Sequence, residues 1–441
     1  MAHRICFVTP AHLRSNPRLV KEASAASAAG YDVSVVYSRH IPRLYAADAS
    51  ILAEHPEWSV AAVEWAWEGV GGRLRRVGTA LRERAAWTVY RRRGGSRAVV
   101  LAHARTHSEM YRLARRTPAD LYVAHNLEAL PAAARAAAHH GAALGFDAED
   151  FHRGEMADIP ANREANALRA QIEAWYLPRC DYVTAASEGI ARAYAEALGI
   201  EPPTVVLNVF PLSERDVSVP TERAAAETPA GARSLFWFSQ TIGPGRGLED
   251  ALAALPLLPD DVVLSLRGTW AGGYEQALMQ QAEALGVAGR VRALPTVPPA
   301  HLIPLAARHD VGLALERTSP VNRNLCLTNK LFTYLTAGLP AVATDTAGQR
   351  SVGEAVPEAV RLARVGDPQA LAEAAASLLA AGDGARRAAS AVAEAWYNWE
   401  TEQEKLLALW ARVLREPRGR GRVGGRTSAP PEPVDAGAPS A

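Results

Sequence analysis

Segments typical of strands and helices alternate along this chain in two successive runs, and this order constrains the fold most. The first run opens with a strand expected at residues 4–9, a helix at 17–29 and a strand at 31–36. The second run opens with a strand at residues 234–239. A repeated βα order places the strands in a parallel sheet with helices on both faces. The sequence therefore predicts an α/β protein with two doubly wound, Rossmann-like domains.

The boundaries of these domains follow from changes in composition. Residues 1–210 are expected to form an N-terminal Rossmann-like domain, and residues 233–384 a C-terminal one, joined by a linker at 211–232 that is rich in Pro, Glu and Ala. Residues 385–415 predict a helix that packs across both domains, and the Pro-, Gly- and Arg-rich residues 416–441 predict a disordered tail. Because doubly wound sheets bind ligands at the carboxyl edge of their strands, we expect the domains to face each other across a cleft.

The bulk composition narrows the class of protein. The formal net charge of +1 provides no global attraction to nucleic acid. Three cysteines, far apart and without a CxxC pair, argue against a disulfide framework or a zinc site and fit a reducing cytoplasm. The chain shows neither a signal-peptide pattern nor a run of about 18 apolar residues. We therefore expect a cytoplasmic protein.

Residues 328–345 contain the most informative local pattern. Thr328 can cap a short helix that Gly338 can end. Lys330 falls in the first turn of this helix, where the helix dipole favours an anion over a cation. A phosphate bound at the helix N-terminus would explain the lysine. A solvated lysine on an ordinary helix is the alternative, and the pattern leaves both open.

A glycine-rich turn follows the first strand of the second run. Its glycines, Gly243, Gly245 and Gly247, would let backbone amides approach a phosphate, and Arg246 can add charge-assisted hydrogen bonds. A tight strand-to-helix turn without a ligand is the alternative. Since Lys330 is expected at the same edge of the sheet, two cations there favour a diphosphate over a single phosphate.

Polar residues also follow two strands of the first run. Asp147, Glu149 and Asp150 form a cluster that can raise one carboxyl pKa for acid–base chemistry, or can simply cap the next segment. His125 ends another strand, and both a catalytic and a structural role are open. Because no second ligand cluster accompanies these carboxylates, we expect no metal site.

The loop after the first strand contains Arg14, Asn16 and Arg18. Asn16 is placed to cap the following helix. The two arginines can contact an anionic ligand from the first domain's side of the cleft, or can remain solvated.

A strongly basic segment lies at residues 73–97, with nine arginines against one acid and with Leu, Val, Trp and Tyr interleaved. This pattern predicts a basic amphipathic surface that binds anionic lipid, which would place the protein on the inner face of the cell membrane. A solvated helix pair that covers the first domain is the alternative. Nucleic acid is not expected, since no known binding motif accompanies the arginines.

Taken together, these segments resemble the glycosyltransferases of the GT-B fold, specifically glycosyltransferase family 4. The most specific matches are residues 237–249 and 328–345, with support from residues 15–22, 181–188 and 208–211. The resemblance implies transfer of a sugar from a nucleotide-diphosphate sugar, with retention at the anomeric carbon and without an obligatory metal or other cofactor. The acceptor would be a polysaccharide, a lipid-linked saccharide, another glycoconjugate or a small molecule.

The resemblance also implies roles for individual residues. The family's pair of phosphate-binding cations falls on Gln240 and Arg246, so Lys330 would supply the missing charge. The family's ribose-binding glutamate falls on Thr333, and a family histidine of the first domain falls on Glu149. The donor-binding residues that we expect are Gly243, Gly245, Arg246, Gly247, Glu316, Asn329, Lys330 and Thr333. Those expected on the acceptor side are Arg14, Asn16 and Arg18, together with Glu149, Asp150 and His125 as catalytic candidates.

Two other functions remain open at this point. A nucleotide-sugar epimerase of the same fold would bind the donor and need no acceptor. A catalytically silent homologue would act as a partner subunit, and the departures at Gln240 and Thr333 motivate this alternative.

Overall fold

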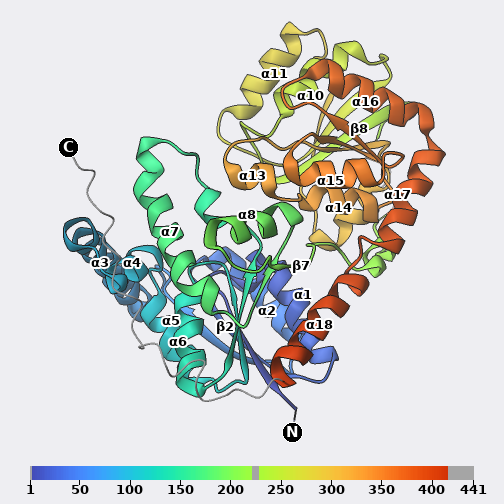
Figure 1. The fold of residues 1–441 in the computed structure, drawn as a ribbon. Coiled ribbons are helices and arrows are strands. Elements are labelled where there is room, and N and C mark those ends of the chain that lie inside the picture. Colours follow the sequence, from blue (N-terminus) through green and yellow to red (C-terminus); the bar gives the residue numbers. More distant parts are fainter. Residues whose placement is uncertain (1, 221–227, 416–441) are drawn as a thin grey trace. The chain divides into compact units, whose positions relative to one another are not determined.

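The computed structural model describes residues 2–220 and 228–415 and divides into two compact units (Figure 1). Unit 1 comprises Met1–Ala185, Ile190–Val206 and Lys405–Ala441, and unit 2 comprises Ala186–Gly189 and Leu207–Glu404. Part of the predicted linker, residues 221–227, and the predicted disordered tail, residues 416–441, lie outside the described residues.

Unit 1 is built on a seven-stranded parallel sheet in the order β3-β2-β1-β4-β5-β6-β7. Its strands are β1 (Arg4–Val8), β2 (Asp32–Arg39), β3 (Ser59–Glu64), β4 (Leu121–His125), β5 (Ala143–Ala148), β6 (Tyr182–Ala185) and β7 (Thr204–Val205). The helices of this part of the chain are α1 (Pro17–Ala28), α2 (Tyr45–Glu54), α3 (Val70–Arg93), α4 (Ser96–His103), α5 (His107–Arg116), α6 (Leu130–His140), α7 (Arg163–Tyr176) and α8 (Glu188–Leu198). The sequence did not predict β3, an edge strand in which only Val63 is buried.

Unit 2 is built on a six-stranded parallel sheet in the order β10-β9-β8-β11-β12-β13. Its strands are β8 (Arg233–Ile242), β9 (Val262–Trp270), β10 (Val291–Leu294), β11 (Val311–Ala314), β12 (Ala341–Thr344) and β13 (Val360–Ala363). Its helices include α10 (Leu248–Ala254), α11 (Tyr274–Ala284), α12 (Leu302–Ala306), α13 (Val321–Leu325), α14 (Asn329–Thr336), α15 (Ala347–Ala355), α16 (Pro368–Ala381) and α17 (Asp383–Ala395). The predicted α/β class with two Rossmann-like parallel sheets is confirmed.

The last described helix, α18 (Trp399–Arg415), contributes to both units, since its residues up to Glu404 belong to unit 2 and those from Lys405 on to unit 1. In unit 1 the indole of Trp410 is fully buried, and its Nε1 donates to the Tyr182 hydroxyl at 2.7 Å. None of the helices in residues 2–220 and 228–415 combines the length and the apolar composition that a membrane-spanning segment needs.

Candidate functional site

The strand order of unit 2 reverses direction between β8 and β11. From β8 the chain builds β9 and β10 on one side of the sheet and then β11, β12 and β13 on the other. In open α/β sheets, ligands bind outside the carboxyl ends of the strands at such a reversal. The glycine-rich turn follows β8, and Glu316 follows β11, so both lie at this position.

The glycine-rich turn requires glycine at two positions. Gly245 and Gly247 have φ values of +70° and +76°, and a Cβ on Gly247 would lie 2.8 Å from the Cβ of Leu315. The guanidinium of Arg323 donates to the Gly245 carbonyl at 2.8 Å and holds the turn from outside. Arg246 is half-buried and makes no side-chain hydrogen bond or ion pair to any described residue. The turn therefore presents a cation that has no partner within the described part of the chain.

Lys330 has a partner, Glu316, that the sequence did not predict. Thr328 caps α14 as predicted, and its side chain accepts from the backbone N–H of Lys330. The Lys330 side chain is buried, with its Nζ 3.1 Å from Oε1 of Glu316 and 5.7 Å from the ring centre of Trp237. The alternative of a solvated lysine is therefore wrong. An ammonium carries three N–H donors, so the bond to Glu316 leaves donors for a further anion.

Two other donor-side candidates on α14 differ from each other in exposure. Asn329 is exposed at the start of α14. Thr333 was expected to face the ligand, but its side chain is only 1% exposed, and its hydroxyl donates to the Asn329 carbonyl at 2.9 Å. This bond to the residue four positions earlier is a usual way to satisfy a buried threonine in a helix. Thr333 is thus a core residue of α14.

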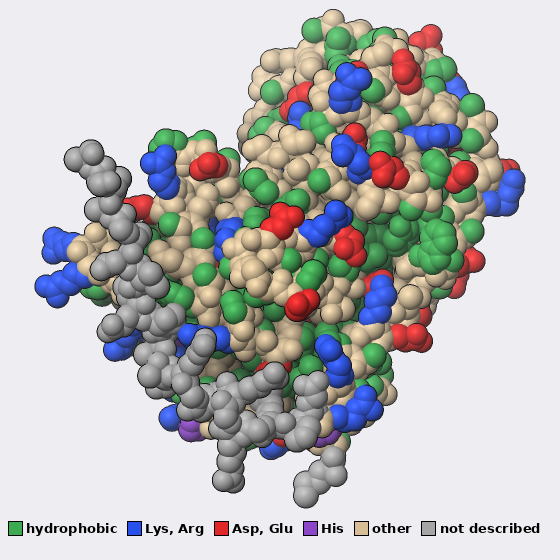
Figure 2. All heavy atoms as spheres, in the orientation of Figure 1, with side chains coloured by type: hydrophobic (Ala, Val, Ile, Leu, Met, Phe, Trp, Pro, Cys, Tyr) green, Lys and Arg blue, Asp and Glu red, His purple; other side chains and the backbone are tan. Residues whose placement is uncertain are grey.

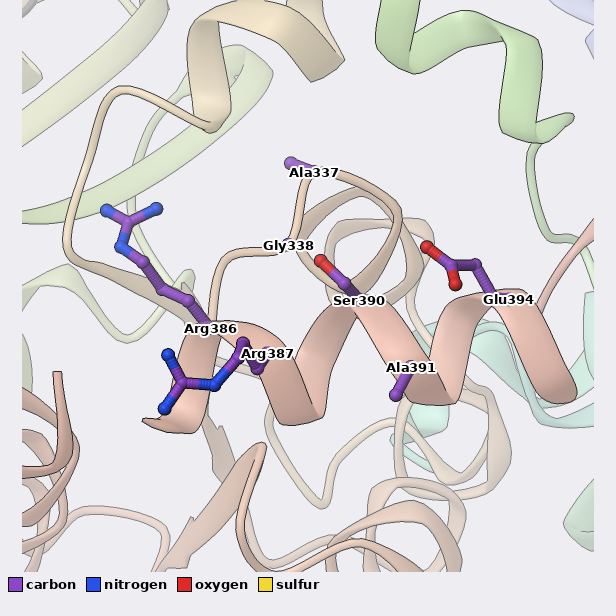
Figure 3. Close-up of a pocket in the computed structure, with 7 residues that line it drawn as sticks. All are labelled: Ala337, Gly338, Arg386, Arg387, Ser390, Ala391 and Glu394. Atoms are coloured by element: carbon purple, nitrogen blue, oxygen red, sulfur yellow. The ribbon is translucent and has the colours of Figure 1, made fainter. Parts of the chain in front are cut away.

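The described hollows of unit 2 do not coincide with this position. One, of about 400 Å³, is lined at the end of α14 by Ala337 and Gly338 and along α17 by side chains that include Arg387 and Glu394 (Figure 3). Lys330 lies in the first turn of α14, so the hollow is at the opposite end of this eight-residue helix, roughly 10 Å away. We therefore do not assign it to the glycine-rich turn.

In unit 1, four charged side chains form a buried cluster at the ends of β4 and β5, which we call the charge quartet: Arg18, Glu22, His125 and Asp147. Arg18 makes two parallel hydrogen bonds to Asp147, of 2.7 and 2.8 Å. The ring nitrogens of His125 lie 3.3 Å from Glu22 and 3.4 Å from Asp147. All four side chains are at most 1% exposed.

The quartet corrects two predictions. Arg18 was expected to contact an anionic ligand, but its guanidinium is buried and also donates to the Val206 carbonyl at 2.8 Å. His125 was a catalytic candidate, but its ring is 1% exposed and lies between two carboxylates, which indicates a positioning role within the quartet. The sequence signal that could have added Glu22 to this cluster is its spacing of four residues from Arg18, which places both on one face of α1.

The charges of the quartet balance one another. Burial alone would lower the pKa of His125, but Glu22 and Asp147 outweigh it and raise the pKa to about 9. The pKa of Asp147 is held well below its usual range, because Arg18 and His125 outweigh the effect of burial. Glu22, His125 and Asp147 lie close enough to hold a metal ion. Arg18 already supplies the cation there, so the residues present fit an ion poorly.

The remaining acceptor-side candidates are close in sequence to Arg18 or to Asp147 of the quartet. Glu149 is half-buried directly after β5, and burial together with Asp150 and Asp147 raises its pKa to about 7, against the opposing effect of Arg18. Asp150 is also half-buried. Asn16 caps α1 as predicted by accepting from the N–H of Leu19. Arg14 is partly exposed, so it is the arginine of this loop that can still meet a ligand.

Comparison with known proteins adds an independent finding. Residues 232–381 match a family model described as "Glycosyl transferases group 1". One similar solved structure is HepE of Anabaena in complex with UDP, at 18% identity and a TM-score of 0.67, covering 93% of this chain and 100% of that chain. A second is sucrose-phosphate synthase from Thermosynechococcus elongatus, at 13% identity and a TM-score of 0.66, covering 93% of this chain and 99% of that chain. A third is the glycosyltransferase WaaG, at 14% identity and a TM-score of 0.55, covering 92% of this chain and 99% of that chain. A comparison with curated proteins finds no match. At these identities the structures support the fold alone.

Proposed function

We propose that this chain, in which residues 232–381 match a group 1 glycosyltransferase model, transfers a sugar from a nucleotide-diphosphate sugar to an acceptor with retention at the anomeric carbon, as glycosyltransferase family 4 does. Unit 2 would bind the donor. The observation that carries this proposal is the glycine-rich turn at the reversal of strand order, where Arg246 has no partner among the described residues. The solved structures of HepE with UDP and with UDP-glucose are consistent with a donor of this class.

The proposed roles follow from charge and exposure. Arg246 and Lys330 would bind the diphosphate and stabilise the charge that develops on it as the glycosidic bond breaks. Glu316 would orient Lys330 through the 3.1 Å ion pair, and the exposed Asn329 would contact the ribose or the sugar. In unit 1, Glu149 would contact the acceptor hydroxyl, because a carboxyl with a pKa near 7 suits proton transfer at neutral pH.

We further propose that the reaction needs no metal ion and that the protein works at the inner face of the cell membrane. The first statement rests on the family resemblance and on Arg246 and Lys330, which would neutralise the diphosphate themselves. The second rests on the basic segment at residues 73–97, and it favours a lipid-linked saccharide as the acceptor.

Incubation with a panel of nucleotide-sugars tests the proposed reaction against its alternatives. Slow release of a nucleoside diphosphate without added acceptor, and faster release with acceptor, is expected of a transferase. Formation of an epimer would assign the protein to the epimerases, and neither product would favour a silent partner subunit. Nuclear magnetic resonance of the product's anomeric proton then tests retention.

Replacement of Arg246 by alanine is expected to weaken binding of the nucleoside diphosphate by about 1.5–3 kcal/mol, which is the cost of losing a hydrogen bond to a charged group. The measurement is calorimetric titration. Lys330 is a poorer target, because its removal would leave Glu316 buried without its cation. Arg308→Ala, at an exposed arginine of the same unit, is the matched control. Equal affinities for the wild type and Arg246→Ala would remove Arg246 from the donor site.

A further inference from the structure

The long helix α3 exposes apolar side chains on one face. Val70, Leu74, Val77 and Leu81 recur at intervals of four, three and four residues, which places them on the same side of the helix. Their exposed fractions are 76%, 69%, 47% and 59%. We call these four residues the apolar stripe. A surface helix normally turns such a stripe toward the core, so its exposure requires an explanation.

The opposite face of α3 holds the helix on unit 1. Thr79 and Ala86 are the buried residues of α3, and both are small. Polar contacts add to the attachment: Arg82 forms two hydrogen bonds to Glu109, of 3.0 and 2.6 Å, and Arg105 donates to the Thr79 hydroxyl at 2.9 Å. The attachment of α3 thus leaves the apolar stripe outside.

Positive charge continues the outer face beyond the stripe. Arg84 and Arg92 lie three and eleven residues after Leu81, on the same side of the helix. Both are exposed, as is Arg93, and none of the three forms an ion pair with a described residue. Figure 2 shows Lys and Arg side chains projecting at the margin of the molecule where Figure 1 labels α3. The outer face therefore combines an apolar first half with a cationic second half.

The apolar and cationic halves of this outer face allow three candidates for the surface that covers it to be compared. A second copy of α3 is itself strongly basic, so it would supply no excess of negative charge for Arg84, Arg92 and Arg93. Residues 416–441 of this chain carry four arginines and three acids, so they offer no excess of negative charge. An anionic lipid surface offers both phosphate groups for the arginines and acyl chains for the stripe. Charge complementarity thus favours the membrane.

We infer that α3 lies in the plane of an anionic membrane with Val70, Leu74, Val77 and Leu81 inserted below the headgroups and Arg84, Arg92 and Arg93 against the phosphates. The inference rests on the proposed peripheral location and names the surface that produces it. A helix of 24 residues is about 36 Å long, so it offers an extended line of contact along the bilayer. It would deliver unit 1, the proposed acceptor side, to a lipid-linked substrate.

Flotation with vesicles tests this face. The full chain is mixed with vesicles of equimolar phosphatidylglycerol and phosphatidylcholine, or of phosphatidylcholine alone, at low and high salt. We expect binding to the anionic vesicles that weakens as salt shortens the Debye length. Leu74→Ser/Leu81→Ser should lower partitioning at least about tenfold, because two leucine side chains no longer leave water. Arg84→Glu/Arg92→Glu should lower it by more than about tenfold.

Each double variant has a matched control in unit 2. Leu257→Ser/Leu285→Ser changes two other exposed leucines, and Arg361→Glu/Arg387→Glu makes the same change of net charge at two other exposed arginines. Both controls should partition like the wild type. All variants should keep the thermal transition of the wild type, because the altered side chains are exposed.

The outcomes that would overturn the membrane inference differ from the outcome that would remove the proposed function. Equal binding of the wild type to anionic and neutral vesicles, or wild-type binding by Leu74→Ser/Leu81→Ser, would overturn the inference. A wild-type dimer in sedimentation that this variant converts to a monomer, with no vesicle binding by either, would make a second copy the occupant instead. Vesicle binding with the expected variant pattern, but no turnover of any nucleotide-sugar, would leave the membrane face standing and remove the proposed function.

Discussion

Replacement of Asp147 by asparagine is expected to lower the free energy of unfolding by about 3–5 kcal/mol, because it leaves the buried guanidinium of Arg18 without its main counter-charge. Asparagine has nearly the same shape as aspartate, so the loss would come from charge and not from a cavity. Chemical denaturation followed by circular dichroism measures the effect. The expected cost is a large part of the stability of an ordinary domain.

The chain contains a matched control for this experiment. Arg233 and Asp261 in unit 2 form the same two parallel hydrogen bonds, of 2.7 and 2.8 Å, but both side chains are substantially exposed. Asp261→Asn should therefore have a much smaller effect on the free energy of unfolding than Asp147→Asn, since water and salt screen an exposed pair. Similar costs at the two sites would show that burial does not determine the contribution of the Asp147 pair.

The quartet also predicts how stability depends on pH. The pKa of His125 rises from 6.5 to about 9 on folding, so its contribution is fully present below pH 6.5 and is lost as pH rises through about 9. The pKa of Asp147 falls below its ordinary 3.8, so its contribution is present above pH 3.8 and is lost as pH falls further. The difference in the free energy of unfolding between the wild type and Asp147→Asn should thus be largest between pH 3.8 and pH 6.5. It should shrink as His125 loses its proton near pH 9.

Local patterns predicted the fold well, because the βα order and the capping residues act within a few positions of one another. Thr328 and Asn16 both cap their helices as the sequence indicated. The edge strand β3 was missed, since a strand with one buried side chain lacks a hydrophobic signal. The edge strand β13, in which Arg361 is exposed, was missed as well.

The candidate sites depend on contacts between residues that are distant in sequence, and these were harder to predict. Arg18 meets Asp147, 129 positions away, and Arg323 meets the Gly245 carbonyl, 78 positions away. No local pattern distinguishes such an arginine from a solvated one. Lys330 was identified as unusual because it opposes the dipole of its own helix, which is a local effect. Its partner Glu316 follows strand β11 and is 14 residues away in the sequence, so only the three-dimensional structure could reveal the ion pair.

Replacement of Glu149 by glutamine is expected to lower the rate of sugar transfer about a hundredfold or more, while binding of the nucleoside diphosphate changes less than about twofold. The carboxylate is the form that accepts a proton from the acceptor hydroxyl. Since burial and neighbouring carboxylates raise the pKa of Glu149 to about 7, the wild-type rate should rise with pH through about 7, and this rise should be absent in the variant. Transfer assays at saturating donor across this pH range measure both effects.

Loss of stability would not explain such a result. An acid whose pKa is raised by folding opposes the fold once it ionises, so the uncharged glutamine should leave the thermal transition at pH 8 unchanged or higher. Glu54→Gln removes the same charge from an exposed position at the end of α2 and should transfer sugar like the wild type. A Glu149→Gln variant that transfers normally at saturating donor but binds the diphosphate poorly would instead place Glu149 on the donor side of the reaction.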